Sequence, residues 1–129
     1  GIKKPHIGIC GLNPHSGESG LLGFEEEEII KPAISILKKK KILVMGPLSP
    51  DSSFTDFSIN KFDGILCMYH DQGLIPVKTI DFYNSVNVTG GLAILRVSPD
   101  HGPAFDISTQ FIARNDSLIS ALKLAEKYK

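Results

Sequence analysis

The amino-acid sequence predicts an α/β fold, because short apolar runs of strand length alternate with longer segments of helical periodicity. The apolar runs at residues 6–11, 42–45 and 62–68 have the length and composition of buried strands. Residues 25–41 instead repeat apolar side chains at helical spacing. With 129 residues, 42% of them hydrophobic, the chain suits one domain with a substantial core.

The first predicted strand, residues 6–11, runs into a glycine-rich loop at residues 12–23 that contains Pro14. No Gly-Lys-Ser/Thr follows, so the loop is not a P-loop. Its glycine spacing also differs from the G-x-G-x-x-G turn of a Rossmann fold. A bound dinucleotide would therefore need another architecture.

The predicted helix at residues 25–41 begins with four glutamates and ends with four lysines, which complement the two ends of the helix dipole. Pro32 should either kink this helix or begin its main body. We expect one apolar face, made of Ile29, Ile30, Ala33, Ile34 and Leu37.

Two predicted strands end close to side chains that can do chemistry. The strand at residues 42–45 leads to Asp51, and the strand at residues 62–68 leads to His70. Open α/β sheets bind ligands at the carboxyl ends of their strands, so both side chains could lie at one such edge. For Asp51, a role as a turn or cap residue is equally compatible with the sequence.

The rest of the chain is predicted to form strands at residues 74–80, 85–88 and 92–98, then a helix at residues 104–114. Asn115 and Asp116 can cap a last helix, whose expected apolar face is Leu118, Ile119, Leu122 and Ala125. The predicted strands contain side chains suited to holding phosphate or carboxylate: Lys78, Asn87 and Arg96. A structural salt bridge would explain Arg96 equally well.

Three of the four histidines lie in glycine-containing turns with a carboxylate within three residues: His15, His70 and His101. Taken singly, each is more simply a hydrogen-bonded polar residue. Together they favour metal binding or acid/base chemistry. Asp71, directly after His70, could orient such a site or assist proton removal.

Composition narrows the expected partners and location. Fourteen basic and fourteen acidic residues give zero formal charge, which disfavours binding to nucleic acid or an anionic membrane. Cys10 and Cys67 lack a paired spacing and should be buried free thiols. With no signal peptide or membrane-spanning run visible, we expect a cytoplasmic protein. Because the chain begins with Gly1, we expect a trimmed chain or the downstream part of a longer one.

Several motifs in order along the chain resemble the C-terminal part of the PdxA family of 4-hydroxythreonine-4-phosphate dehydrogenases. They are Gly-Leu-Asn-Pro-His-Ser-Gly-Glu at residues 11–18, Glu26-Glu27 through Pro32-Ala33, Gly46-Pro47 with Asp51, Met-Tyr-His-Asp-Gln-Gly-Leu at residues 68–74, Lys78, Asn87 with Thr89, Arg96, and Asp-His-Gly at residues 100–102.

The resemblance implies one incomplete half of a two-domain subunit of the isocitrate/isopropylmalate dehydrogenase-like fold, with a mixed sheet flanked by helices. Residues 1–110 would form the metal- and substrate-site domain. Residues 111–129 would form a C-terminal helix that packs on a missing N-terminal domain. It further implies a homodimer with a shared active site, which uses NAD and a divalent metal: zinc, magnesium or cobalt.

By the same resemblance, His15 and His70 would be metal ligands, and a third histidine ligand would lie upstream of this chain. The substrate-binding residues would be Lys78, Asn87 and Arg96. Asp71 and Lys78 would be the catalytic residues. The cofactor-binding residues would be Asp51, Thr89, His101 and Gly102.

The implied reaction is NAD-dependent oxidation, with decarboxylation, of 4-phosphooxy-L-threonine to 3-amino-2-oxopropyl phosphate in pyridoxal 5'-phosphate (vitamin B6) biosynthesis. We expect the fragment alone to be inactive. The alternatives are a dehydrogenase of a related phosphorylated hydroxy acid such as phospho-threonate, and a non-catalytic ligand-binding or dimerisation module. A metal hydrolase built on His15, His70 and Asp51 is a further alternative, and it would need no NAD.

Overall fold

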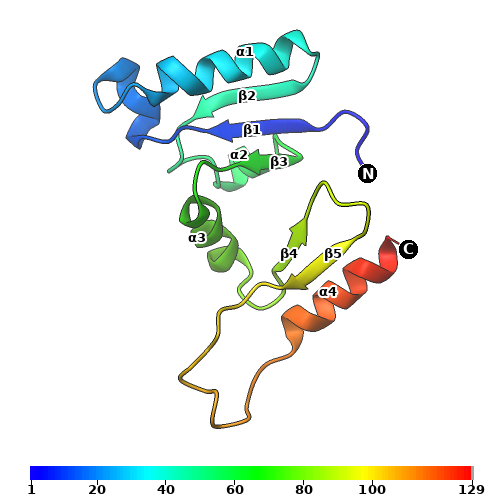
Figure 1. The fold of residues 1–129 in the computed structure, drawn as a ribbon. Helices are drawn as coiled ribbons and strands as arrows, with labels where there is room; N and C mark the ends of the chain where they lie inside the picture. The colour runs from blue at the N-terminus through cyan, green and yellow to red at the C-terminus, as the bar shows by residue number, and fades with distance from the viewer. Residues whose placement is uncertain (129) are drawn as a thin grey trace. The chain divides into compact units, whose positions relative to one another are not determined.

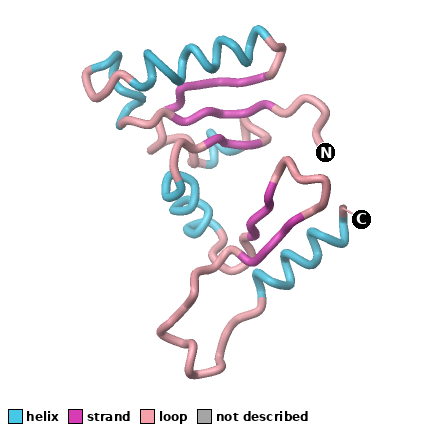
Figure 2. The backbone as a smooth tube through the Cα atoms, in the orientation of Figure 1, coloured by secondary structure: helices cyan, strands magenta, loops and turns pink. Residues whose placement is uncertain are grey.

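A three-stranded parallel sheet forms the centre of the first part of the chain (Figures 1 and 2). Its strands are β1 (His6–Cys10), β2 (Leu43–Leu48) and β3 (Gly64–Leu66), and β1 lies between the other two. His6 pairs with Leu43 on one side, and Ile7 pairs with Gly64 on the other. All three predicted strands are therefore present, β3 being shorter than predicted.

The computed structural model describes residues 1–128, and these fall into two compact units, Gly1–Pro76 and Val77–Lys129. The α/β class is confirmed, whereas the chain length alone predicted one domain. The first unit holds the parallel sheet and the second holds an antiparallel pair of strands. The domain boundary that the resemblance implies at residue 110 stays a prediction.

The predicted helix over residues 25–41 exists, but it begins with a π-helical turn at Glu26–Ile30 and continues as α1 (Lys31–Lys39). Pro32 lies in the first turn of α1, where a missing N–H costs no hydrogen bond. The buried side chains follow one row at i, i+4 and i+7 spacing, so the apolar stripe is narrower than predicted. Ile30 and Ile34 are buried and Leu37 is half-buried, whereas Ile29 and Ala33 are exposed, contrary to prediction.

The core of the first unit forms where this helix packs on the sheet. It consists of four buried aliphatic side chains: Ile9, Ile30, Ile34 and Val44. The partly buried side chains of Ile7, Leu37 and Met68 pack against these four. Side chains alternate between the two faces of a strand, so Val44 of β2 is buried while its neighbours Leu43 and Met45 are exposed on the other face.

The prediction of a strand at residues 74–80 is wrong, because residues His70–Ile80 form helix α3. The apolar run from Leu74 to Val77 resembles a strand, but tertiary hydrogen bonds decide the conformation. The buried Gln72 accepts a bond from the backbone N–H of Met68 (2.7 Å) and donates one to the carbonyl of Gly11 (2.8 Å). These bonds fix the first turn of the helix beside the sheet. A shorter helix, α2 (Asp56–Ile59), precedes β3.

In the second unit, β4 (Val86–Thr89) and β5 (Arg96–Pro99) pair in antiparallel fashion, and α4 (Asp116–Lys127) packs against both strands. The predicted helix at residues 104–114 is wrong, since this segment is a series of turns. Ala104 and Phe111 have φ values of 47° and 55°, which a right-handed helix does not allow.

Helix α4 buries a different face from the one predicted. Ser117 and Ala121 are buried, whereas Leu118, Ile119 and Leu122 are exposed. The small side chains face the hairpin because they allow the helix axis to approach the strands closely. Residue 129, the last position of the predicted C-terminal helix, lies outside the described residues.

We expect the substitution Ile34→Ala to destabilise the first unit by about 2–5 kcal/mol, because it leaves a cavity in the core beneath α1. The matched control is Ile36→Ala on the same helix, which should change stability by less than about 0.5 kcal/mol. Ile34 is 4% exposed and Ile36 is 54% exposed. Urea denaturation of the full-length protein measures both; equal effects would mean that the helix does not pack as described.

Candidate functional site

The loops that follow the three parallel strands form a pocket of about 250 Å³ at the carboxyl edge of the sheet. Its lining includes Leu12, Asn13, His15, Asp51, Tyr69 and Gln72. His15 comes from the loop after β1, Asp51 from the loop after β2, and Tyr69 from the segment after β3. Open α/β sheets bind ligands at this position. Asp51 lines the pocket, whereas His70, which was predicted to lie at the same edge, is not among the residues that line it.

The loop that carries His15 has an unusual backbone. Residues 15–19 all have positive φ, from 43° at Glu18 to 79° at Gly17, and so form a left-handed turn within Pro14–Gly20. For residues other than glycine, this conformation costs roughly 1–2 kcal/mol each. Such strain persists where the surrounding structure holds it in place, and it is concentrated at functional sites.

The carboxylate of Asp51 lies within electrostatic reach of His15 at this pocket. The carboxylate of Asp51 accepts a hydrogen bond from Ser49 Oγ (2.7 Å). That bond lowers the pKa of Asp51, partial burial opposes it, and the charge of His15 lowers the pKa further. Asp51 is therefore a carboxylate near neutral pH, placed beside an imidazole. Asp51 thus makes a turn interaction with Ser49 and also lines the pocket, so the two roles considered for it are compatible.

His70 and Asp71 form the first turn of α3, directly after Tyr69, and both are exposed. Among the described residues, no group of three or more His, Cys, Asp or Glu side chains lies in an arrangement that could hold a metal ion. The chain's own donors near the pocket thus do not make a complete metal site.

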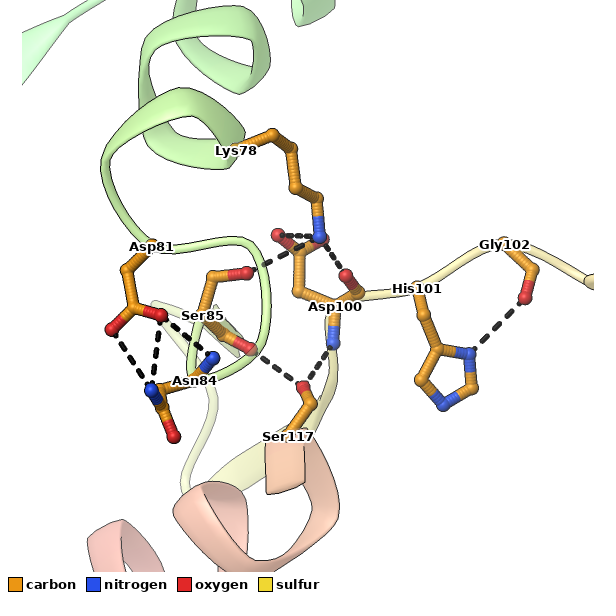
Figure 3. Close-up of polar contacts among 8 residues, drawn as sticks. All are labelled: Lys78, Asp81, Asn84, Ser85, Asp100, His101, Gly102 and Ser117. Atoms are coloured by element: carbon orange, nitrogen blue, oxygen red, sulfur yellow. Dashed lines mark hydrogen bonds and ion pairs between the residues drawn. The ribbon is translucent and has the colours of Figure 1, made fainter. Parts of the chain in front are cut away.

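In the second unit, Lys78 is held by three oxygen acceptors (Figure 3). Its Nζ pairs with the carboxylate of Asp100 at 3.0 Å, donates to Ser85 Oγ at 3.2 Å, and donates to the backbone carbonyl of Asp100. Lys78 and Asp100 are both half-buried, with side-chain exposures of 24% and 19%. Partial burial strengthens such an ion pair relative to one on the surface.

Ser117, in the first turn of α4, ties this arrangement together. Its Oγ donates to the carbonyl of Ser85 (2.6 Å) and accepts from the backbone N–H of Asp100 (2.9 Å) (Figure 3). One hydroxyl therefore connects α4 to the segments that begin β4 and follow β5. Sequence reasoning missed Asp100, Ser85 and Ser117 as site residues, because no motif marks a residue that holds another.

The strand register brings other predicted residues together. Thr89 pairs directly with Arg96, and Asn87 pairs with Ser98, so Asn87, Thr89 and Arg96 share one face of the hairpin. Arg96 Nη1 donates to Thr89 Oγ1 at 2.8 Å. The ion pairs of the described residues do not include Arg96, so its alternative explanation as a salt-bridge residue is not supported.

The turn predicted to hold part of a nucleotide is exposed. His101 Nδ1 lies 3.1 Å from the carbonyl oxygen of Gly102, which accepts a hydrogen bond from it (Figure 3). A Cβ atom on Gly102 would meet nothing within 4 Å. The turn therefore has open space beside Gly102, and its role in nucleotide binding stays a prediction.

Cys10 and Cys67 are free thiols, as predicted, with Cys10 buried and Cys67 half-buried. They end neighbouring parallel strands, because Ile9 pairs with Leu66. Burial, together with the adjacent Cys10, raises the pKa of Cys67 to about 11. A thiol with such a pKa is almost entirely protonated near pH 7 and is a poor nucleophile.

The fold and its polar groups define an α/β protein with a pocket at the carboxyl edge of a parallel sheet, and with an antiparallel hairpin that carries Asn87, Thr89 and Arg96 on one face. Residues 1–125 match the family model described as pyridoxal phosphate biosynthetic protein PdxA. The chain belongs to the PdxA family.

Two relatives named 4-hydroxythreonine-4-phosphate dehydrogenase illustrate the match. The chain is 51% identical over 127 residues to the protein of Caulobacter vibrioides, covering 98% of this chain and 38% of the relative. It is 52% identical over 125 residues to that of Desulforapulum autotrophicum, covering 97% of this chain and 37% of the relative. The chain thus spans little more than a third of the length of these relatives.

Solved structures agree with this assignment. The crystal structure of 4-hydroxythreonine-4-phosphate dehydrogenase from Klebsiella pneumoniae is 43% identical, with a TM-score of 0.84 over 97% of this chain and 38% of that chain. A terephthalate 1,2-cis-dihydrodiol dehydrogenase from Burkholderia xenovorans is 34% identical, with a TM-score of 0.70 over 96% of this chain and 39% of that chain. Within residues 1–128, no helix has the length and apolar character needed to span a membrane.

We expect Ser117→Ala to destabilise the second unit by about 1–3 kcal/mol, because it leaves the Asp100 N–H and the Ser85 carbonyl without their shared partner. Ser120→Ala on the same helix is the control. The Ser120 hydroxyl makes a long hydrogen bond (3.5 Å) to Asn84 Oδ1, so its loss should change stability less than the loss of the Ser117 hydroxyl. Hydrogen exchange at the Asp100 amide in the full-length protein reports the change. If the Asp100 amide is protected from exchange equally well in Ser117→Ala and in the unmodified protein, the hydrogen bond from Asp100 N–H to Ser117 Oγ is not a stabilising contact.

Proposed function

We propose that the protein to which this chain belongs oxidises 4-phosphooxy-L-threonine with NAD, with loss of carbon dioxide, to give 3-amino-2-oxopropyl phosphate in vitamin B6 biosynthesis. The observation that carries this proposal is 51% identity, over 98% of the chain, to a protein named 4-hydroxythreonine-4-phosphate dehydrogenase. The polar side chains of both units support it, because they suit a small phosphorylated acid.

The second unit would bind the anionic groups of the substrate through Lys78, Asn87 and Arg96. Arg96 offers a planar set of donors that matches phosphate or carboxylate, and Asn87 lies on the same face of the hairpin. The three donors of the Lys78 ammonium are already occupied by Asp100 and Ser85. A substrate oxygen would therefore replace one of these acceptors without moving the lysine far.

The oxidation removes a hydride from the carbon that bears the hydroxyl group and a proton from the hydroxyl oxygen. NAD would supply the hydride acceptor when bound, and our candidates for binding it are Asp51, Thr89, His101 and Gly102. Asp71 and Lys78 are our candidates for proton transfer, since each presents a titratable group at its end of α3. The resulting β-keto acid would then lose its carboxylate as carbon dioxide.

The requirement for a divalent metal is also part of the proposal, with zinc, magnesium or cobalt as candidates. His15 and His70 would supply two ligands. Since the described residues do not form a complete site by themselves, the remaining ligands would come from the part of the protein outside this chain. A cytoplasmic homodimer with a shared active site completes the proposal.

A second candidate is oxidation of a different hydroxylated acid, either phospho-threonate or a related compound. It is favoured by the structural match to a terephthalate 1,2-cis-dihydrodiol dehydrogenase, which shows that this fold also occurs in a dehydrogenase with a different named substrate. Comparing NADH formation from 4-phosphooxy-L-threonine, phospho-threonate and a cis-dihydrodiol in the full-length protein distinguishes these candidates.

We expect Lys78→Met in the full-length protein to lower kcat/KM for 4-phosphooxy-L-threonine about 10- to 100-fold, because a charge-assisted hydrogen bond is worth about 1.5–3 kcal/mol. Lys123→Met, on the exposed surface of α4, is the control and should stay within about twofold of the unmodified enzyme. Initial rates of NADH formation measure both. An unchanged kcat/KM in Lys78→Met would remove Lys78 from the substrate site.

A further inference from the structure

We propose that Glu26 is a positioning residue, which fixes the loop of residues 11–17 and so holds His15 at the pocket. This inference rests on the proposed function, since it assigns His15 a role in that reaction. Glu26 does not line the pocket itself. It would act on the chemistry through the loop.

The side chain of Glu26 is buried, with 1% of its surface exposed, although it carries a carboxyl group. Its Oε1 accepts hydrogen bonds from the backbone N–H groups of Leu12 (2.6 Å) and Asn13 (2.8 Å). Its Oε2 accepts a third from Asn13 Nδ2 (2.9 Å). The ion pairs of the described residues do not include Glu26, so the loop itself satisfies this buried carboxylate.

These bonds also keep the carboxyl group ionised. Burial raises the pKa of Glu26, but the hydrogen bonds from Asn13 and Leu12 outweigh it, and the pKa lies below its usual value. The position of Glu26 at the start of a helix adds a favourable dipole. Near neutral pH, Glu26 is thus an anion that attracts the loop's N–H groups.

The same carboxylate leaves no room for a side chain at two positions of the loop, both of which are glycine. A Cβ atom on Gly11 would lie 2.9 Å from Glu26 Oε1, and one on Gly17 would lie 2.7 Å from Glu26 Oε2. Gly17 also has a φ of 79°, which favours glycine. The loop therefore closes around Glu26 on both sides of His15.

The connection to His15 is short. Asn13, which donates two of the three hydrogen bonds to Glu26, precedes the left-handed turn, and its carbonyl accepts a hydrogen bond from the N–H of Ser16 (3.1 Å). Ser16 Oγ is buried without a hydrogen-bond partner in the described structure, so this side chain provides no alternative anchor. The strain of the left-handed turn needs a fixed point. Glu26 provides it.

The test uses the full-length protein with Glu26→Asp, Glu26→Gln and Glu26→Ala. Aspartate keeps the charge but is one methylene too short to reach Leu12 and Asn13. Glutamine keeps Oε1 as an acceptor without the charge. Glu28→Asp and Glu28→Ala, on the exposed side of the same helical turn, are the matched controls. Amide hydrogen exchange at Leu12 and Asn13, kcat and KM are measured for each.

We expect Glu26→Asp and Glu26→Ala to lose protection of the two amides and about 100-fold in kcat, because small displacements of a reacting group have effects of this size. KM should stay within about threefold, since the substrate's anionic groups would bind to the second unit. Glu26→Gln should recover most of the protection and part of kcat, and the Glu28 variants should resemble the unmodified enzyme.

Normal amide protection and normal kcat in Glu26→Asp would overturn the proposal. So would a loss confined to KM. If Glu26→Ala does not fold, the Asp and Gln variants decide the question. If the unmodified protein forms no NADH from any of the three substrates, the proposed function fails, and the exchange rates at Leu12 and Asn13 still decide whether Glu26 holds the loop.

Discussion

The parallel pairing of β1 with both β2 and β3 is the constraint on which the candidate pocket depends. Because all three strands point in the same direction, the segments that follow them emerge at one edge of the sheet. His15, Asp51 and Tyr69 are far apart in the sequence and meet in the pocket for this reason. An antiparallel partner in place of β2 or β3 would send one of these loops to the opposite edge.

The second unit depends on a different kind of constraint, a small polar network instead of a sheet edge. The carboxylate of Asp100 pairs with the ammonium of Lys78, and the backbone N–H of Asp100 donates a hydrogen bond to the hydroxyl of Ser117. The hairpin, α4 and the end of α3 thus converge on one half-buried residue. A lysine held in this way loses little further rotamer freedom when an anion binds, which favours affinity.

The sequence predicted the elements whose residues carry a strong local pattern. β1, β2, β4 and α4 have runs of the right period, and the α/β class follows from them. The predicted strand at residues 74–80 failed because the tertiary bonds of Gln72 outweigh the β-preference of the apolar run. The prediction of a helix at residues 104–114 failed because Ala104 and Phe111 adopt positive φ. The pattern of side chains along the sequence does not predict that conformation.

The same division applies to the candidate site. His15, Asp51, Lys78 and Arg96 could be selected from the sequence, because their functional groups are unusual beside apolar strands and their motifs resemble those of a family. Three other residues could not be selected from the sequence, because each acts through hydrogen bonds to residues distant in sequence. Glu26 bonds to Leu12 and Asn13, and Gln72 bonds to Gly11. Ser117 bonds to Ser85 and Asp100. Glu26 in particular stands among four consecutive glutamates, and the sequence alone assigns all four to the helix dipole. Burial separates it from its neighbours, and burial of a carboxylate is tolerated here because the loop that carries His15 supplies the donors.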